Sequence, residues 1–99
     1  MLTRRVDLRF PIELPGATIA HVTAHPIGAY DFQMMDTSDE ARLTAFANCI
    51  RLPTNVAGEV DDFDLLRVVD AIADLSRLAV EQSRAESRPV LTLIQGQQA

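Results

Sequence analysis

The most regular hydrophobic pattern of the chain lies between residues 60 and 83, where apolar residues recur at steps of three and four. This spacing stacks side chains along one side of an α-helix. One apolar row consists of Leu65, Val68, Ile72, Leu75 and Ala79, and a second row beside it consists of Leu66, Val69, Ala73 and Val80. Together the rows are wider than one neighbouring element needs. We therefore predict a long helix over residues 61–83 and self-association of the chain through it, as a homodimer or larger assembly.

Charged residues occupy the remaining face of this predicted helix. They are Asp64, Arg67, Asp70, Asp74, Arg77 and Glu81. Opposite charges at steps of three, such as Asp64–Arg67 and Asp74–Arg77, are at contact spacing on a helix. Acidic residues crowd the first turn, where the helix dipole favours them.

The N-terminal segment has the two-residue period of a β-strand. Apolar residues alternate with polar ones from Val6 to Leu14, which predicts a half-buried strand. Pro11 lacks an amide donor, so we expect this strand to be an edge strand or to be bulged there. Pro15-Gly16 indicates a turn, and residues 18–23 are typical of a returning strand. The pattern predicts a β-hairpin over residues 5–24 and leaves its register open.

Two shorter helices are predicted between the hairpin and the long helix. The first covers residues 30–35. Thr37 and Glu40 form a capping-box pattern that begins the second, which runs to about Arg51 and ends before Pro53. Residues 54–59 form a connector that has room for one helical turn. The expected fold class is therefore α+β, with an N-terminal β-hairpin followed by two or three α-helices, the last one long.

The segment after Ser83 differs in character from the rest. It is polar as far as Pro89, which disfavours helix continuation, and an apolar patch over residues 90–94 follows. We expect this patch to add a strand to the hairpin edge, with ordering by a partner as the alternative. The predicted organisation is a single domain over residues 1–83 with a C-terminal extension over residues 84–99.

Composition narrows the function classes. The 99 residues are 47% hydrophobic and carry a net charge of -5, which fits a small globular domain and disfavours general nucleic-acid binding. Cys49 is the single cysteine, as expected of a reducing compartment. The N-terminus lacks a signal-peptide pattern, and no apolar run approaches the length of a membrane span. We expect a soluble intracellular protein.

Candidate chemistry is sparse. His21 and His25 would lie about 13 Å apart on a strand, too far to share a metal. Cys49 lies beside the apolar stripe of the second helix and is expected to be a buried, inert thiol. The acidic clusters lie at the expected helix N-termini, where the helix dipole favours acidic side chains. No phosphate-binding or nucleophile motif occurs. We expect neither catalysis nor a cofactor nor a metal site.

The order of the segments resembles a known family. A strand containing Phe10-Pro11-Ile12 is followed by Gly16, by Val22-Thr23, by Pro26 and by a short helix with Asp31. Further on, Leu52-Pro53 ends a helix and Asp62-Phe63 precedes the final one. Over residues 6–80 this order is similar to that of the phage tail assembly chaperones of contractile-tailed phages.

The resemblance implies a non-enzymatic protein of the bacterial host cytoplasm that is absent from the mature virion. Such chaperones bind the long, helical tape-measure protein and assist the assembly of tail-tube protein around it. The candidate partner-binding residues are Met34, Met35, Phe63, Leu66, Val69, Ile72, Leu75, Val90, Leu93 and Ile94. Flexible methionine side chains and the wide apolar band are suited to binding the apolar stripe of a client helix. The alternative interpretation is that Met34 and Met35 simply fill the core.

An alternative function is a small dimeric regulatory or adaptor domain of the antitoxin-like kind. Members of that class usually carry a basic segment that binds nucleic acid. Here only Arg4, Arg5 and Arg9 could supply one, so the chaperone is the preferred hypothesis.

Overall fold

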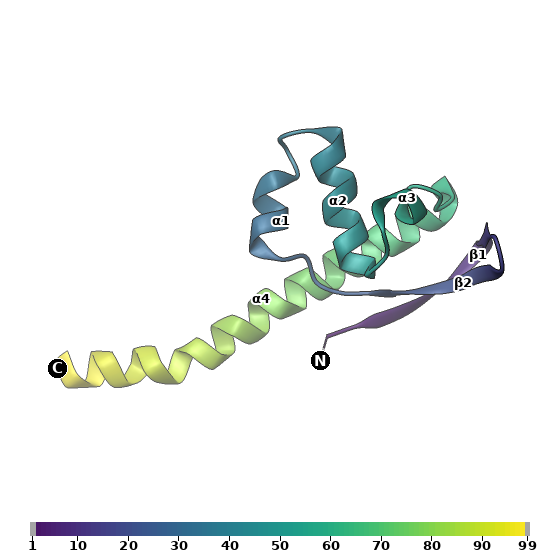
Figure 1. The fold of residues 1–99 in the computed structure, drawn as a ribbon. Helices are drawn as coiled ribbons and strands as arrows, with labels where there is room; N and C mark the ends of the chain where they lie inside the picture. The colour runs from purple at the N-terminus through teal and green to yellow at the C-terminus, as the bar shows by residue number, and fades with distance from the viewer. Residues whose placement is uncertain (1, 99) are drawn as a thin grey trace.

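The computed structural model describes residues 2–98, with side chains described for residues 2–85. Its elements are β1 (Arg4–Leu14), β2 (Ala17–Ala24), α1 (Ala29–Met34), α2 (Asp39–Ile50), α3 (Thr54–Ala57) and α4 (Asp62–Gln98). Figure 1 shows α4 running between the hairpin on one side and the α1–α2 pair on the other. The expected α+β class is confirmed, with four helices because the connector forms the single-turn α3.

The two strands form an antiparallel hairpin that is bulged in the middle of β1. Gly16 takes a positive φ of 78° at the turn, as the Pro-Gly pair predicts. Asp7 pairs with His21, but the next pair along β1 is Ile12 with Ile19. Residues 8–11 therefore lie opposite Ala20 alone, so the bulge expected at Pro11 is confirmed.

The bulge changes which side chains of β1 face the core. Val6, Leu8 and Ile12 are buried, as alternation predicts, whereas Phe10 is 51% exposed. Its neighbours Arg9 and Pro11 are exposed too. The period-two expectation is therefore wrong at Phe10, because the extra residues of the bulge turn this part of the strand away from the core.

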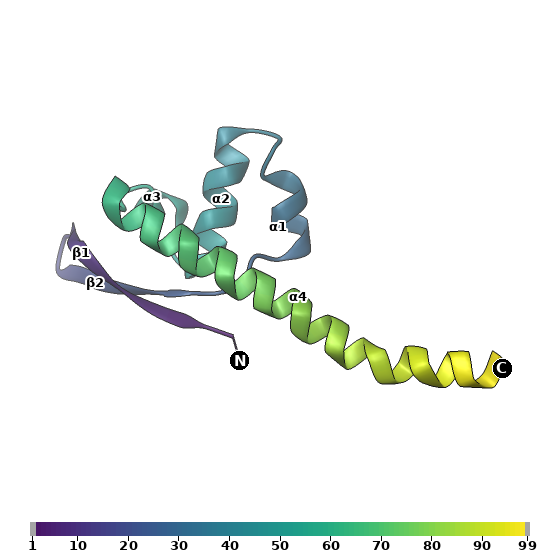
Figure 2. The same cartoon turned by 180° about the vertical axis from the view of Figure 1, so that it is seen from behind.

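One apolar cluster joins the hairpin to the helices. Buried side chains of β1, β2, α2, α3, the turn before α4 and the first half of α4 form it: Val6, Leu8, Ile12, Val22, Ala24, Ala47, Cys49, Ile50, Ala57, Val60, Val68, Ala71, Ile72 and Leu75. The first apolar row of α4 supplies Val68, Ile72 and Leu75 to this core. Figure 2 shows from behind how α4 crosses the hairpin with this half of its length.

The start of α2 differs from the expected one by a residue. Ser38 is the N-cap, and its Oγ accepts the N–H of Ala41 at 3.0 Å. The hydroxyl of Thr37 instead donates to the carbonyl oxygen of Met34 at 2.7 Å. The capping box predicted at Thr37 is thus wrong, because that side chain closes the turn after α1. At the other end Arg51 takes a left-handed conformation (φ 58°), and the chain leaves the helix at Leu52-Pro53 as predicted.

Helix α4 is longer than the sequence predicts. It continues past Ser83 and through Pro89 to Gln98, so the predictions of a helix end near Ser83 and of an added strand over residues 90–94 are wrong. Proline removes one backbone hydrogen bond and kinks a helix, a local cost that the surrounding helix-forming residues can offset. The C-terminal part of α4 extends well beyond the rest of the molecule (Figure 1).

Candidate functional site

An apolar cleft separates α4 from the α1–α2 pair. Its first part is a cavity of ≈ 200 Å³ lined by Ile27, Met35, Arg42, Ala45, Phe46, Cys49, Val69 and Ile72. Its second part, of ≈ 600 Å³, opens between α1 and the middle of α4 and is lined by Ile27, Ala29, Phe32, Gln33, Ser76, Arg77, Ala79, Val80, Ser83 and Arg84. Ile27 lines both parts, so they are neighbours, and we refer to the two together as the cleft. A concave apolar surface with few polar groups is typical of a binding site for an apolar partner.

The connector before α1 is held in place on both sides of the cleft. The N–H of Ile27 donates to Oγ of Ser76 on α4 at 3.0 Å, and Ser76 donates in turn to the carbonyl oxygen of Ile72. Two residues earlier, the N–H of His25 donates to the carbonyl oxygen of Cys49 on α2 at 2.8 Å. These bonds fix the base of the cleft, so its walls are set by the fold.

The second apolar row of α4 lies outside the core. Leu66 is 69% exposed, Val69 44% and Val80 51%, and Ala73 is exposed as well. Phe32 of α1, at 65% exposure, faces the same cleft as Val80. Exposed apolar side chains gathered in this way mark an interaction surface more often than scattered ones do.

An aromatic cluster lies near the start of α4. The rings of Phe10 and Phe63 meet edge to face with centroids 6.4 Å apart, and the Arg9 guanidinium lies 5.2 Å from the centre of the Phe63 ring. About half of each ring remains exposed. The cluster holds the bulge of β1 against α4 and leaves apolar surface beside Leu66.

Asp64 is the buried charged residue among the described side chains, with no exposed surface. Its carboxylate accepts the backbone N–H groups of Arg9 and Phe10, each at 2.9 Å, and the guanidinium of Arg67 at 3.2 Å. Burial raises the pKa of Asp64, but the two N–H groups and Arg67 outweigh it, so this pKa lies below its ordinary value. The assignment of Asp64 to the solvent face is therefore wrong: this residue completes the hairpin.

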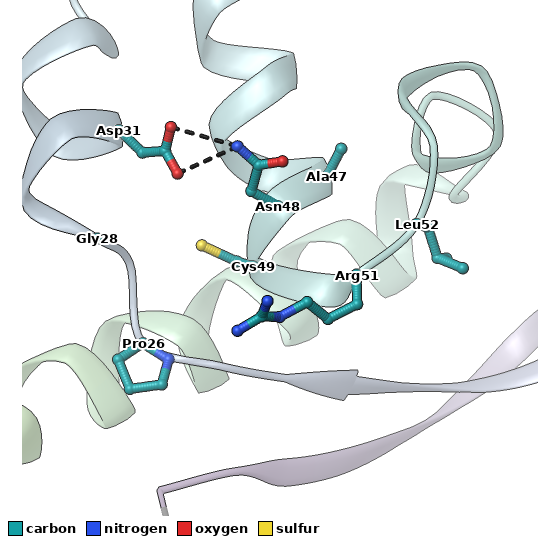
Figure 3. A pocket seen from close by; sticks show the side chains of 8 residues that line it. All are labelled: Pro26, Gly28, Asp31, Ala47, Asn48, Cys49, Arg51 and Leu52. Atoms are coloured by element: carbon teal, nitrogen blue, oxygen red, sulfur yellow. Dashed lines mark hydrogen bonds between the residues drawn. The ribbon is translucent and has the colours of Figure 1, made fainter.

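A polar pocket lies between the start of α1 and the end of α2, and Cys49 is among the residues that line it (Figure 3). Asn48 donates to both carboxylate oxygens of Asp31 at 3.2 and 3.3 Å. Burial raises the pKa of the Cys49 thiol, the charge of Asp31 raises it further, and Arg51 lowers it only in part. A protonated, buried thiol is a poor nucleophile, so the structure agrees with an inert Cys49.

Within the part of the chain that the structure describes, no group of three or more histidine, cysteine or acidic side chains is arranged to hold a metal ion. Over the same residues, no helix is both long and apolar enough to cross a membrane.

The structure places the candidate partner-binding residues in several different environments. Met35 and Val69 line the cleft, Met34 lies in a separate hollow between α1 and the start of α2, and Phe63 and Leu66 are exposed on α4. Ile72 and Leu75 are buried in the core, which removes them from the outer surface, although Ile72 also lines the cleft. The side chains of Val90, Leu93 and Ile94 lie outside the described residues.

Phe32 and Ile27 belong to the cleft but were not among the candidates. Phe32 lies three residues before Met35, a spacing that places both on one face of α1, and this is the signal that could have identified it. Ile27 stands outside any periodic segment, so the sequence contained no comparable signal for it.

Comparison of the chain with models of protein families, with curated proteins and with solved structures gives no match in any of the three.

Proposed function

We propose that this protein is a non-enzymatic phage tail assembly chaperone that binds the tape-measure protein and assists tail-tube assembly. The proposal starts from the order of segments over residues 6–80, which resembles that family. The observation that carries it is the apolar cleft between α4 and the α1–α2 pair, with Phe32 and Val80 exposed on its two walls.

The chemistry of the cleft suits a helical client. An amphipathic helix binds a groove by placing apolar side chains at steps of three and four into it, and a tape-measure protein offers long stripes of this kind. Met35 in the deeper part is a flexible apolar side chain that adapts to different client residues. The net charge of -5 favours solubility of a complex that contains an aggregation-prone client. In this proposal the protein works in the host cytoplasm and leaves before the virion is complete.

Co-expression with the tape-measure protein of the same phage or prophage tests the function. We expect the wild-type chain to keep the tape-measure protein in the soluble fraction and to co-purify with it. Phe32→Asp and Val80→Asp should abolish both effects, because each introduces a charge into an apolar contact.

Tyr30→Asp is the matched control. Tyr30 is an aromatic residue of α1 that is 72% exposed and lies outside the cleft. The Tyr30→Asp variant should bind the client as the wild type does. The proposal fails if the tape-measure protein is equally soluble without the chain, or if all three variants behave alike while remaining folded.

A further inference from the structure

The outer face of α4 is arranged symmetrically about Ala73. Apolar residues lie at equal distances on either side of it, and the acidic residues before it are matched by basic residues after it. Seven residues before Ala73 lies Leu66, and seven after it lies Val80. Asp70 is three residues before it and Arg77 four after it, while Asp62 and Arg84 lie eleven on either side. All seven residues are exposed in the single chain. A face of this kind is complementary to itself when two copies lie antiparallel.

From this pattern we infer that two copies of the chain form a symmetric dimer, with their α4 helices antiparallel and a two-fold axis passing between the two Ala73 residues. A two-fold interface uses the same patch on both copies, so every contact occurs twice. Leu66 of each copy then lies opposite Val80 of the other, and Asp70 lies opposite Arg77. Asp62 and Arg84 form a further pair of opposite charges at each end.

The size of the central residue favours this arrangement. Ala73 leaves room for the two helix axes to approach to the 8–10 Å typical of packed helices. Leu66 and Val80, exposed in one chain by 69% and 51%, would be covered on both sides of the centre. The C-terminal part of α4 protrudes from the rest of the molecule, so the fold leaves space beside it for a partner helix (Figure 1).

Charge selects the antiparallel orientation. In a parallel pair about the same residue, Asp70 would lie beside Asp70 of the other copy and Arg77 beside Arg77, and like charges at contact distance are unfavourable. In the antiparallel pair each of these residues lies beside a residue of opposite charge. The existing surface pair of Arg77 with Asp74, at 3.5 Å and largely exposed, is a weak competitor.

The dimer does not depend on the proposed chaperone function, but the two share a surface. Val69 and Val80 of the second apolar row line the cleft as well. The partner's α4 would lie along the open side of the cleft and add a wall to it.

Disulfide cross-linking tests the geometry on the purified chain without any client. Ala73→Cys, in a Cys49→Ala background, places two thiols on the two-fold axis, where the Cα atoms of packed helices come within disulfide range. We expect oxidation to give a covalent dimer. Val80→Cys in the same background is the control: Val80 is on the same face as Ala73, but in the antiparallel dimer its two copies are about 21 Å apart along the axis and do not react.

The same experiment distinguishes the alternatives. A parallel dimer would cross-link at both positions, and a monomer at neither. Either result overturns the inference. Because both substitutions are at exposed positions of α4, the subunit should stay folded, which circular dichroism checks.

Charge reversal tests the pairing. In sedimentation velocity, Asp70→Arg should weaken dimerisation by about tenfold, since it sets two arginines against each other at two symmetric places. Adding Arg77→Asp to the same chain should restore the dimer. Asp36→Arg makes the same change in the exposed turn after α1 and should have no effect. Equal effects of Asp70→Arg and Asp36→Arg, or no recovery in the double variant, would contradict the pairing whether or not the chain binds a tape-measure protein.

Discussion

The carboxylate of Asp64 on α4 accepts the backbone N–H of Phe10 on β1 at 2.9 Å, across 54 residues of sequence. Its other oxygen accepts the N–H of Arg9, so one side chain accepts two backbone N–H groups of the bulge, where the ladder of the hairpin is interrupted. Arg67 binds the same carboxylate and also the carbonyl oxygen of Asp7. A side chain of the last helix thus supplies the hydrogen bonds that the second strand does not.

Asp64→Ala should therefore destabilise the fold strongly. It leaves two part-buried N–H groups without an acceptor, at about 1–3 kcal/mol each, so we expect a loss of about 3 kcal/mol in the free energy of unfolding. Urea denaturation followed by circular dichroism measures it. Glu81→Ala, at an exposed position on the same helix outside the proposed dimer interface, should change stability by less than about 0.5 kcal/mol. Similar losses in the two variants would show that the buried hydrogen bonds contribute little.

The lowered pKa of Asp64 predicts a dependence of stability on pH. A carboxyl group whose pKa is lower in the folded state stabilises the fold above its unfolded pKa, near 3.9, and this contribution is lost as the pH falls through the folded value. The wild type should lose stability below about pH 4. Asp64→Asn, measured over the same range, should start less stable and lose less. Parallel curves for the two proteins would argue against Asp64 as the titrating group.

The two apolar rows of α4 should respond differently to truncation. Ile72 is buried in the core, so Ile72→Ala should cost about 3 kcal/mol of subunit stability. Leu66→Ala removes a mostly exposed side chain and should leave the stability of the subunit almost unchanged. It follows that Ile72→Asp would unfold the subunit, whereas the sequence left dissociation of an assembly open as the other outcome. Chemical denaturation at a concentration where the chain is monomeric gives both values.

Cys49 should react slowly in the folded protein. Its thiol is buried and its pKa is raised, first by that burial and then by Asp31, so little thiolate is present near neutral pH. A coloured thiol reagent should label the native chain much more slowly than the chain in urea. Cys49→Ala should lower stability by about 1 kcal/mol. Rapid labelling of the native protein would mean that the thiol is accessible and that the assignment of Cys49 as a buried structural residue is wrong.

Local patterns in the sequence predict most of the secondary structure, because each depends on nearby residues. The row that contains Val68 and Leu75 faces the core as its spacing requires, and Pro15-Gly16 makes the turn. The second row, with Leu66 and Val80, remains exposed in the subunit, as expected of a band too wide for one neighbour.

The errors at Asp64 and Phe10 have a common physical origin in contacts between distant segments. The role of Asp64 depends on two amides that a bulge leaves unpaired some 54 residues away, and no periodic pattern encodes that bulge or its partner. Phe10 is exposed for the same reason. The cleft depends on how α1 is held beside α4 through the hydrogen bond between Ile27 and Ser76. The sequence of neither segment predicts this contact by itself.

The bond between Asp64 and the bulge also sets an order of events during synthesis. The ribosome completes both strands of the hairpin before it adds a single residue of α4. Until residue 64 and the turn around it have emerged, the amides of Arg9 and Phe10 have no acceptor in the protein and remain bonded to water. The nascent hairpin is therefore incomplete until these residues have emerged, and we expect its strands to become protected from proteolysis only once the first turns of α4 can close over them.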